Sequence, residues 1–230
     1  MTSLNCVLFD LDGTLLDTAP DLADALNQLR QQHHLNALPL ADIRHLAGHG
    51  SAALLKIGMN VSDQHPHFTA LLEEFFRLYQ ARLTNAAQLF QGIDTVLHYL
   101  DTHLIPWGIV TNRPSRFTFD LLKHFKLEHR AQCIICGDTL TKRKPDPAPI
   151  LHACELLKQP PSSCLYIGDT QTDVIASKAA GTRSLVTLYG YQGAQDQPRS
   201  WNADAYVETA HDIIPWIKHF QSAQAIIHSF

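Results

Sequence analysis

Two carboxylates one residue apart, Asp10 and Asp12, directly follow a short apolar stretch near the start of the chain. The stretch Cys6 to Phe9 is too short for a helix and rich in strand formers, which predicts an interior strand of a parallel sheet. Ligands of open α/β sheets bind beyond the carboxyl ends of the strands. Two like charges there suggest a bound cation, or an acid and a nucleophile with divided roles. A plain turn is the alternative, because Asp-Gly is a common turn pair and Gly13 follows Asp12.

Polar residues also follow another predicted strand, 107–110. Thr111 and Asn112 offer a hydroxyl and backbone N–H groups at its end, although an isolated Thr-Asn pair is usually a turn. Residues 142–147 carry three cations, which could simply be solvated. Lys144 precedes Pro145, which favours an extended backbone and so a fixed direction. A lysine there would offset the charge of a phosphate group beside an ionised Asp10.

A second acidic pair follows the predicted strand 164–167. Asp169 ends this strand as Asp10 ends the first, and Asp173 opens a helix, where a carboxylate is also favourable as a cap. Asp10, Asp169 and nearby carbonyl oxygens are the hard ligands that Mg²⁺ prefers. The sequence therefore predicts a Mg²⁺ site beside a phosphate site.

The spacing of apolar residues predicts how these strand ends are brought together. Between residues 17 and 87 it indicates four helices and no strand, whereas helix and strand alternate after Gly92. We expect an α/β fold, a doubly wound, Rossmann-like parallel sheet core formed by residues 1–16 and 88–230. Residues 17–87 would form an inserted helical cap domain over Asp10. Thr18 and Asp21 are expected to start its first helix.

The cap loop 48–51 is the expected source of substrate selection, because the core meets only the phosphate. His49 and Ser51 can hydrogen-bond hydroxyl or carboxylate oxygens, although these residues could merely end and begin helices. Arg113, beside Thr111, could offer its planar fork to a substrate carboxylate.

Composition excludes several classes of protein. The chain has 230 residues, 45% of them hydrophobic, and a net charge of −4, so nothing suggests a nucleic-acid partner. The first strand begins close to Met1 and no apolar run reaches the roughly 18 residues of a membrane span, so we expect a cytoplasmic protein without membrane contact, monomeric or weakly dimeric. The five cysteines are expected to be free thiols, and Cys133 and Cys136 to be packed in the core.

Taken together, these motifs resemble those of the haloacid dehalogenase superfamily of phosphotransferases. The residues that carry the resemblance occur in the family's order: Phe9-Asp10-Leu11-Asp12-Gly13-Thr14, Val110-Thr111-Asn112, Lys144-Pro145 and Ile167-Gly168-Asp169-Thr170-Gln171-Thr172-Asp173. The resemblance implies that Asp10 is the nucleophile that becomes an aspartyl phosphate and that Asp12 is the general acid and base. It implies that Thr111 and Lys144 bind the phosphoryl group. Its Mg²⁺ ligands would be Asp10, the carbonyl of Asp12, and Asp169 with Asp173.

Two branches of the superfamily are especially similar. The cap and Tyr189-Gly190-Tyr191 resemble the phosphoglycolate phosphatases, and Leu89-Phe90-Gln91-Gly92 and Trp201-Asn202-Ala203-Asp204 look closer to the N-acetylmuramic acid 6-phosphate phosphatases, which commonly have Lys at position 113. The expected function is a Mg²⁺-dependent phosphomonoesterase acting on a small phosphorylated metabolite, N-acetylmuramic acid 6-phosphate or 2-phosphoglycolate. A sugar phosphomutase usually carries a Ser-Arg pair that residues 48–52 lack. A non-catalytic regulator would be expected to lose a carboxylate or the lysine.

Overall fold

The computed structural model describes residues 4–222, so the outermost residues of the predicted core, 1–3 and 223–230, lie outside it. Six strands form one parallel sheet, which confirms the predicted α/β class. Their order across the sheet is β5 (Ile134–Ile135), β4 (Trp107–Val110), β1 (Cys6–Phe9), β6 (Cys164–Gly168), β7 (Arg183–Thr187) and β8 (Ala205–Val207). Phe9 lies opposite Ile109 and Ile167 on the two neighbouring strands. The residues after β1, β4 and β6 therefore leave the sheet side by side.

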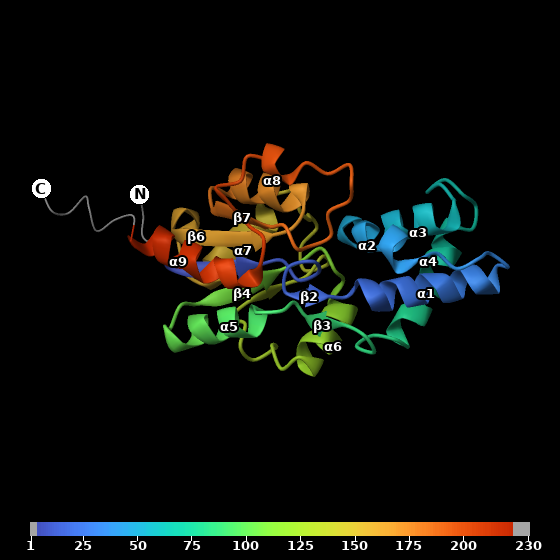
Figure 1. The fold of residues 1–230 in the computed structure, drawn as a ribbon, viewed down its shortest axis with the longest axis horizontal. Coiled ribbons are helices and arrows are strands. Elements are labelled where there is room, and N and C mark those ends of the chain that lie inside the picture. The colour runs from blue at the N-terminus through green and yellow to red at the C-terminus, as the bar shows by residue number, and fades with distance from the viewer. Residues whose placement is uncertain (1–3, 223–230) are drawn as a thin grey trace, which may run out of the picture.

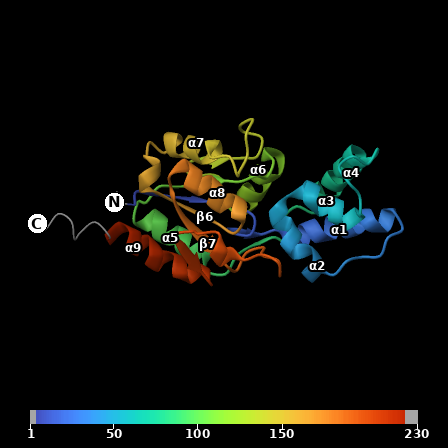
Figure 2. The same ribbon diagram turned by 90° about the horizontal axis from the view of Figure 1, so that it is seen from above.

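Helices cover both faces of the sheet. Figure 2 shows α7 (Ala148–Leu156) and α8 (Gln171–Ala180) on one face, and α5 (Ile93–Thr102) and α9 (Ile213–Ser222) on the other. The strand period of two divides the core accordingly, because Leu8 packs in the cluster that includes α7 and α8 whereas Phe9 packs with α5 and α9. The remaining core helix, α6 (Ser115–His124), links β4 to β5. A doubly wound core results, with β1 at its centre.

A group of helices lies beyond the carboxyl ends of the strands, at the end of the molecule opposite α9 (Figure 1). They are α1 (Ala19–Gln32), α2 (Leu40–Arg44), α3 (Ser51–Met59) and α4 (Phe68–Gln80), with a 3₁₀ helix at His45–His49. The two chain crossings to the core pair as a short antiparallel ribbon, β2 (Leu16–Asp17) with β3 (Gln88–Leu89). Of the predicted limits of the cap domain, residue 17 lies in β2 and residue 87 directly precedes β3.

Several local predictions differ from the structure. The sequence predicts one short helix from Pro39 to Gly48, whereas the structure has α2 and the 3₁₀ helix there. It also predicts a long helix up to about Thr84, whereas α4 ends at Gln80 and Thr84 has a φ of 78°. Thr18 does not cap α1 with its side chain. The phenolic oxygen of Tyr191 instead accepts the N–H groups of Thr18 and Ala19, at 2.7 and 2.9 Å. A distant residue thus does what a local cap was expected to do.

Asp21 also has another role than starting α1. Its carboxylate accepts the N–H groups of Ala86 and Ala87, at 2.8 and 3.0 Å. These two residues directly precede β3, so Asp21 fastens the returning chain to the first helix of the cap. At the end of the chain, Asp212 was the expected cap of the last helix. The capping box instead joins it to Thr209, one 3₁₀ turn earlier.

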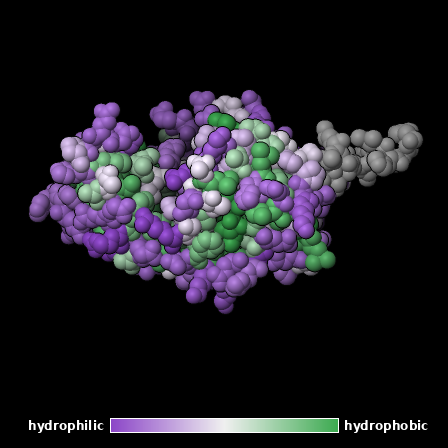
Figure 3. Space-filling view, turned by 180° about the vertical axis from the view of Figure 1, so that it is seen from behind, coloured by the Kyte–Doolittle hydropathy of each residue, from purple (hydrophilic) through white to green (hydrophobic). Residues whose placement is uncertain are grey.

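The sequence also predicts free cysteine thiols and no membrane-spanning segment. All five cysteines are free and buried, and burial raises the pKa of the Cys133 thiol to about 12, which suits packed core thiols. Among residues 4–222, no helix combines the length and apolarity needed to cross a bilayer. Figure 3 shows hydrophobic residues gathered on the core's part of one face, while the outline of the cap is mostly hydrophilic.

Candidate active site

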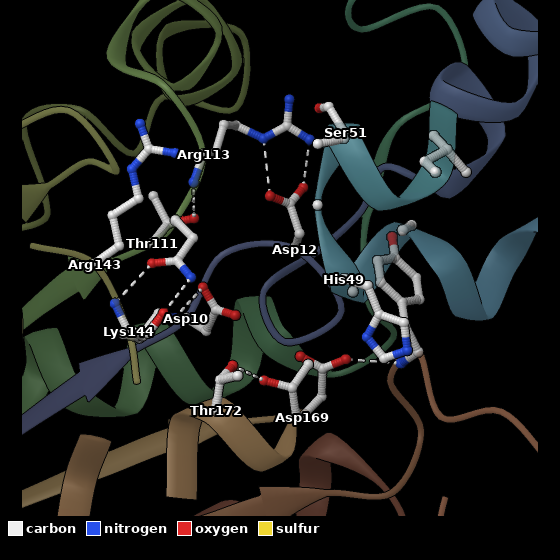
Figure 4. A pocket seen from close by; sticks show the side chains of 18 of the residues that line it. Asp10, Asp12, His49, Ser51, Thr111, Arg113, Arg143, Lys144, Asp169 and Thr172 are labelled. Carbon is white, nitrogen blue, oxygen red and sulfur yellow. Dashed lines mark hydrogen bonds and ion pairs between the residues drawn. The ribbon is translucent and has the colours of Figure 1, made fainter. Parts of the chain in front are cut away.

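The floor of the site is formed where three neighbouring strands end. Asp10 follows β1, Thr111 follows β4 and Asp169 follows β6, and all three residues are buried. Above them, the cap residues 47–52 close a cavity of about 760 Å³ (Figure 4). The strand order of the sheet therefore brings the polar strand ends that the sequence predicted into one cavity between core and cap.

Lys144 joins the acidic groups of the floor. Its Nζ lies 2.9 Å from Asp10 Oδ1 and 2.7 Å from Asp173 Oδ1, and the side chain is 2% exposed. The amide of Asn112 donates to the Lys144 carbonyl and accepts its N–H, at 2.9 and 3.0 Å. Lys144 precedes Pro145 across a cis peptide bond. Asn112, predicted to bind substrate, thus holds the backbone of Lys144 with its side chain.

The floor carries more negative than positive charge. Burial, with the charge of Asp173, outweighs Lys144 and raises the pKa of Asp10 to about 7. Burial and the charges of Asp173 and Asp10 also raise the pKa of Asp169 well above its usual range. Burial acts on Asp173 in the same sense, but the ion pair and hydrogen bond with Lys144 outweigh it and lower its pKa. One lysine therefore does not balance the three carboxylates.

This charge excess and the donor set fit a divalent cation. One oxygen from each of Asp10, Asp169 and Asp173 can be chosen so that the three lie within 4.8 Å of one another, and all three residues are buried. Oxygen atoms of this kind are the ligands Mg²⁺ takes. Gly13, with a φ of 79°, passes so close to the Asp169 carboxylate that any Cβ would collide with it. The glycine of the first motif thus makes room for the acid of the fourth.

Asp173 accepts hydrogen bonds from Thr170, Lys144 and Tyr166. Its Oδ2 accepts the N–H and hydroxyl of Thr170 in the capping box of α8, at 3.0 and 2.6 Å. Its Oδ1 accepts Lys144 Nζ. Asp173 therefore caps α8 and also lies close to the other acidic groups, as the two interpretations of the sequence proposed.

Asp12 lies apart from this cluster and pairs with Arg113. The guanidinium donates from Nε to Asp12 Oδ2 at 2.8 Å and from Nη2 to Oδ1 at 2.6 Å (Figure 4). The Thr18 hydroxyl also donates to Oδ1. We expected the Arg113 guanidinium to bind a substrate carboxylate, whereas in the structure it binds the carboxylate of Asp12.

The predicted cap residues face the same cavity. His49 and Ser51 both line it, with Leu72 and Phe76 as apolar neighbours from α4. From the core side, Arg143 lines the cavity as well, and its side chain forms no hydrogen bond or ion pair within residues 4–222. From the sequence, Arg143 was one of three neighbouring cations that could simply be solvated.

Three tyrosines were not predicted to take part in the site. The Tyr166 hydroxyl accepts Lys144 Nζ at 2.8 Å, the Tyr191 N–H donates to Asp169 Oδ2 at 2.8 Å, and the Tyr79 hydroxyl accepts Arg113 Nη1 at 2.6 Å. Tyr166 had been assigned to a buried strand and Tyr79 to an apolar helix face. For Tyr166 and Tyr79, a phenol within an otherwise apolar, buried run was the available signal, because a buried hydroxyl needs a partner.

Comparisons with known proteins agree with this geometry. The family model described as haloacid dehalogenase-like hydrolase matches residues 7–187. A phosphoglycolate phosphatase from Xanthomonas campestris pv. campestris (strain 8004) is 40% identical over 202 residues, 88% of this chain and 91% of that protein. The N-acetylmuramic acid 6-phosphate phosphatase of Pseudomonas aeruginosa is 34% identical over 211 residues, 92% of this chain and 93% of its own length.

A solved structure gives the same result for the fold. The crystal structure of a predicted phosphoglycolate phosphatase from Haemophilus somnus 129pt superposes with a TM-score of 0.83 at 25% identity, covering 94% of this chain and 99% of that one. Fold and cavity together define an α/β protein that carries a buried acidic cluster at the carboxyl ends of its strands, beneath a helical cap. The chain belongs to the haloacid dehalogenase-like hydrolase family, and the predicted enzyme class, a phosphatase, is confirmed.

Proposed function

We propose that the protein is a Mg²⁺-dependent phosphomonoesterase that works through an aspartyl phosphate on Asp10. The observation that carries the proposal is the meeting of Asp10 and Asp169 at adjacent strand ends beneath the cap, with Lys144 paired to Asp10. A nucleophilic carboxylate needs its orientation fixed and its charge partly compensated. The Leu11 N–H donates to Asp10 Oδ1 at 2.8 Å, and Lys144 lies on the same oxygen.

In the first step, Asp10 attacks phosphorus in line with the leaving oxygen. The Asp10–phosphorus bond forms as the bond from phosphorus to the leaving oxygen breaks, and Asp12 donates its proton to that oxygen. Lys144 and the N–H and hydroxyl groups near Thr111 hold the remaining phosphoryl oxygens. Positioning and charge stabilisation supply most of the catalysis in phosphoryl transfer.

In the second step, water attacks the aspartyl phosphate. Asp12, now ionised, takes the proton of this water while the Asp10–phosphorus bond breaks and inorganic phosphate leaves. Asp12 thereby returns to its protonated state. The cap would exclude bulk water during the first step.

Asp10 and Asp169 would hold Mg²⁺, with the carbonyl of Asp12 and with Asp173 adjoining, as the resemblance implies. When bound, the ion would neutralise charge on the phosphoryl oxygens and orient them. Lys144 pairs with both Asp10 and Asp173 and so orients these two carboxylates.

The preferred substrate that we propose is N-acetylmuramic acid 6-phosphate, with 2-phosphoglycolate as the alternative. A cavity of about 760 Å³, lined by His49, Ser51 and the apolar Leu72 and Phe76, favours a sugar over a two-carbon acid. Both substrates carry a carboxylate. Since the guanidinium of Arg113 is already paired with Asp12, Arg143 is the cation on this cavity that could bind the substrate carboxylate. Relatives named for each of the two substrates resemble this chain, so they do not decide between the substrates. We also propose a cytoplasmic location.

The test is a side-by-side measurement of kcat/KM for both substrates and for 4-nitrophenyl phosphate, with Mg²⁺. We expect turnover of all three and the highest value for N-acetylmuramic acid 6-phosphate. A clearly higher value for 2-phosphoglycolate would reverse the substrate assignment. No turnover of any phosphomonoester would contradict the proposed function.

A further inference from the structure

A continuous chain of buried side chains runs from the cap to Asp12. It begins at Tyr79 on α4, passes through the guanidinium of Arg113 after β4, and ends on the Asp12 carboxylate. Tyr79 is 1% exposed and Arg113 8%. Asp12 and Arg113 belong to the core. Tyr79 lies on α4 of the cap, about thirty positions before Arg113 in the sequence.

Every nitrogen of the Arg113 fork is engaged within this chain. Nε and Nη2 donate to Asp12, Nη1 donates to Tyr79, and Nη2 also lies 3.3 Å from the Thr18 hydroxyl oxygen. A planar fork held at three corners has little freedom to rotate. Without the Tyr79 hydroxyl, a buried Nη1 would lose the only acceptor the described residues give it, and the guanidinium would have to shift to find another.

The aromatic surroundings fix Tyr79 in turn. Its ring is stacked with Phe75, centroids 6.3 Å apart, and meets Phe117 of α6 edge to face at 5.3 Å. The Arg113 guanidinium carbon lies 5.2 Å from the Tyr79 ring centroid. The hydroxyl is thus presented to Arg113 from a rigid position that depends on the packing of α4 against α6.

The two oxygens of Asp12 are used unequally. Oδ1 accepts both Arg113 Nη2 and the Thr18 hydroxyl, which fills its two lone pairs. Oδ2 accepts only Arg113 Nε among the described residues. Oδ2 is therefore the oxygen with capacity left to carry a proton.

We propose that Arg113 and Tyr79 are positioning residues for proton transfer by Asp12, with the proton carried on Oδ2. Arg113 orients the carboxylate, and Tyr79 orients Arg113 from the cap. Asp12 Oδ2 gives its proton to the leaving oxygen as the bond from phosphorus to that oxygen breaks and the Asp10–phosphorus bond forms. This inference rests on the proposed function and adds to it a link by which the seating of the cap governs the acid step.

Substituted phenyl phosphates test the link, because they change leaving-group basicity with little change of size and carry no carboxylate. A misplaced general acid harms poor leaving groups most, since a good one departs without a proton. For Arg113→Lys we expect kcat/KM to fall by about a hundredfold for phenyl phosphate and only a few-fold for 4-nitrophenyl phosphate, the range general acids supply. For Tyr79→Phe we expect the same pattern with roughly a tenfold loss for phenyl phosphate.

Tyr79→Phe keeps the ring and its packing, so it serves as the variant least prone to misfolding. Tyr206→Phe is the matched control, because it also removes a hydroxyl that accepts an N–H, that of Ala203, but at β8. It should keep the wild-type dependence on the leaving group. If Tyr79 acts through Arg113, the double variant should show the same dependence as Arg113→Lys alone.

Equal losses for all phenyl phosphates in folded Tyr79→Phe and Arg113→Lys would overturn the proposal, as would fully additive effects in the double variant. Circular dichroism establishes that each variant is folded. This failure differs from failure of the proposed function, in which the wild-type protein would hydrolyse none of the phenyl phosphates.

Discussion

The floor of the site and the wall beneath the cap hold their charged groups in different ways. On the floor, Lys144 is bound by Asp10, Asp173 and Tyr166, all from the core. At the wall, Arg113 holds Asp12 but depends on Tyr79 from the cap. We therefore expect phosphate and metal binding to depend on the sheet, and proton transfer and substrate choice to depend on the cap. Changes on the floor should abolish activity, and changes at the wall should alter its selectivity.

The largest expected effect is on the floor. Asp10→Asn should abolish turnover, because an amide is a poor nucleophile and a weaker metal ligand, while the circular dichroism spectrum stays that of the wild type. Turnover of 4-nitrophenyl phosphate with Mg²⁺ measures the loss. Asp63→Asn, which changes an exposed carboxylate paired with Lys56, is the control and should be fully active. Appreciable residual activity in Asp10→Asn would exclude Asp10 as the nucleophile.

Metal removal should have an effect of similar size. Chelation should stop turnover, and Ca²⁺ should bind but support little of it, because its larger and looser shell disturbs in-line geometry. Addition of Mg²⁺ to the metal-free protein should raise Tm, since the ion binds the folded state. Asp169→Asn should lose most of that rise. Undiminished activity after exhaustive chelation would contradict the metal role of Asp169.

The rise in Tm should also depend on pH in a definite sense. The pKa of Asp10 is raised from 3.8 to about 7 in the metal-free fold. Its contribution to stability is therefore fully present below pH 3.8 and lost as the pH rises through about 7. Mg²⁺ binds the ionised carboxylate and offsets this loss, so the Mg²⁺-induced rise in Tm should be larger at pH 8 than at pH 5. A rise that is the same at both pH values would contradict the charge balance described for the floor.

A smaller effect is expected from the cap loop. His49→Ala should lower kcat/KM for N-acetylmuramic acid 6-phosphate several-fold more than for 4-nitrophenyl phosphate, because His49 lines the cavity from the cap loop, where we expect the leaving group to be selected. His129→Ala, at a histidine whose side chain is 90% exposed, is the matched control. Parallel losses on both substrates would show that His49 does not select the leaving group.

The floor was more predictable from sequence than the wall. Asp10, Thr111 and Asp169 each follow an apolar run, and parallel strands necessarily bring such ends to one edge. Lys144 was singled out among its neighbouring cations by its position before Pro145 and by the family's motif. The sheet and the helical insertion followed from hydrophobic periodicity alone.

The contacts of Arg113 with Asp12 and Tyr79 could not be predicted, because these residues are far apart in the sequence and come together only in the folded protein. Tyr79 satisfies the spacing of an apolar helix face, and its hydroxyl gains meaning only when α4 is placed against Arg113. Arg113 was assigned to an external carboxylate because its internal partner, Asp12, lies 101 positions away in sequence. Thr18 likewise has contacts with Asp12 and Tyr191 across the domain junction instead of its expected local role as a helix cap.

The central claim is that Asp10 carries the phosphoryl group between two steps, and Asp12→Ala tests it most directly. With 4-nitrophenyl phosphate, whose leaving group needs little protonation, the first step should proceed while the second lacks its base. After acid quenching and digestion, mass spectrometry should find the phosphoryl group on the peptide that contains Asp10. The double variant Asp10→Asn, Asp12→Ala should carry none. A phosphoryl group on another residue, or release of nitrophenol without a phosphorylated protein, would contradict the account.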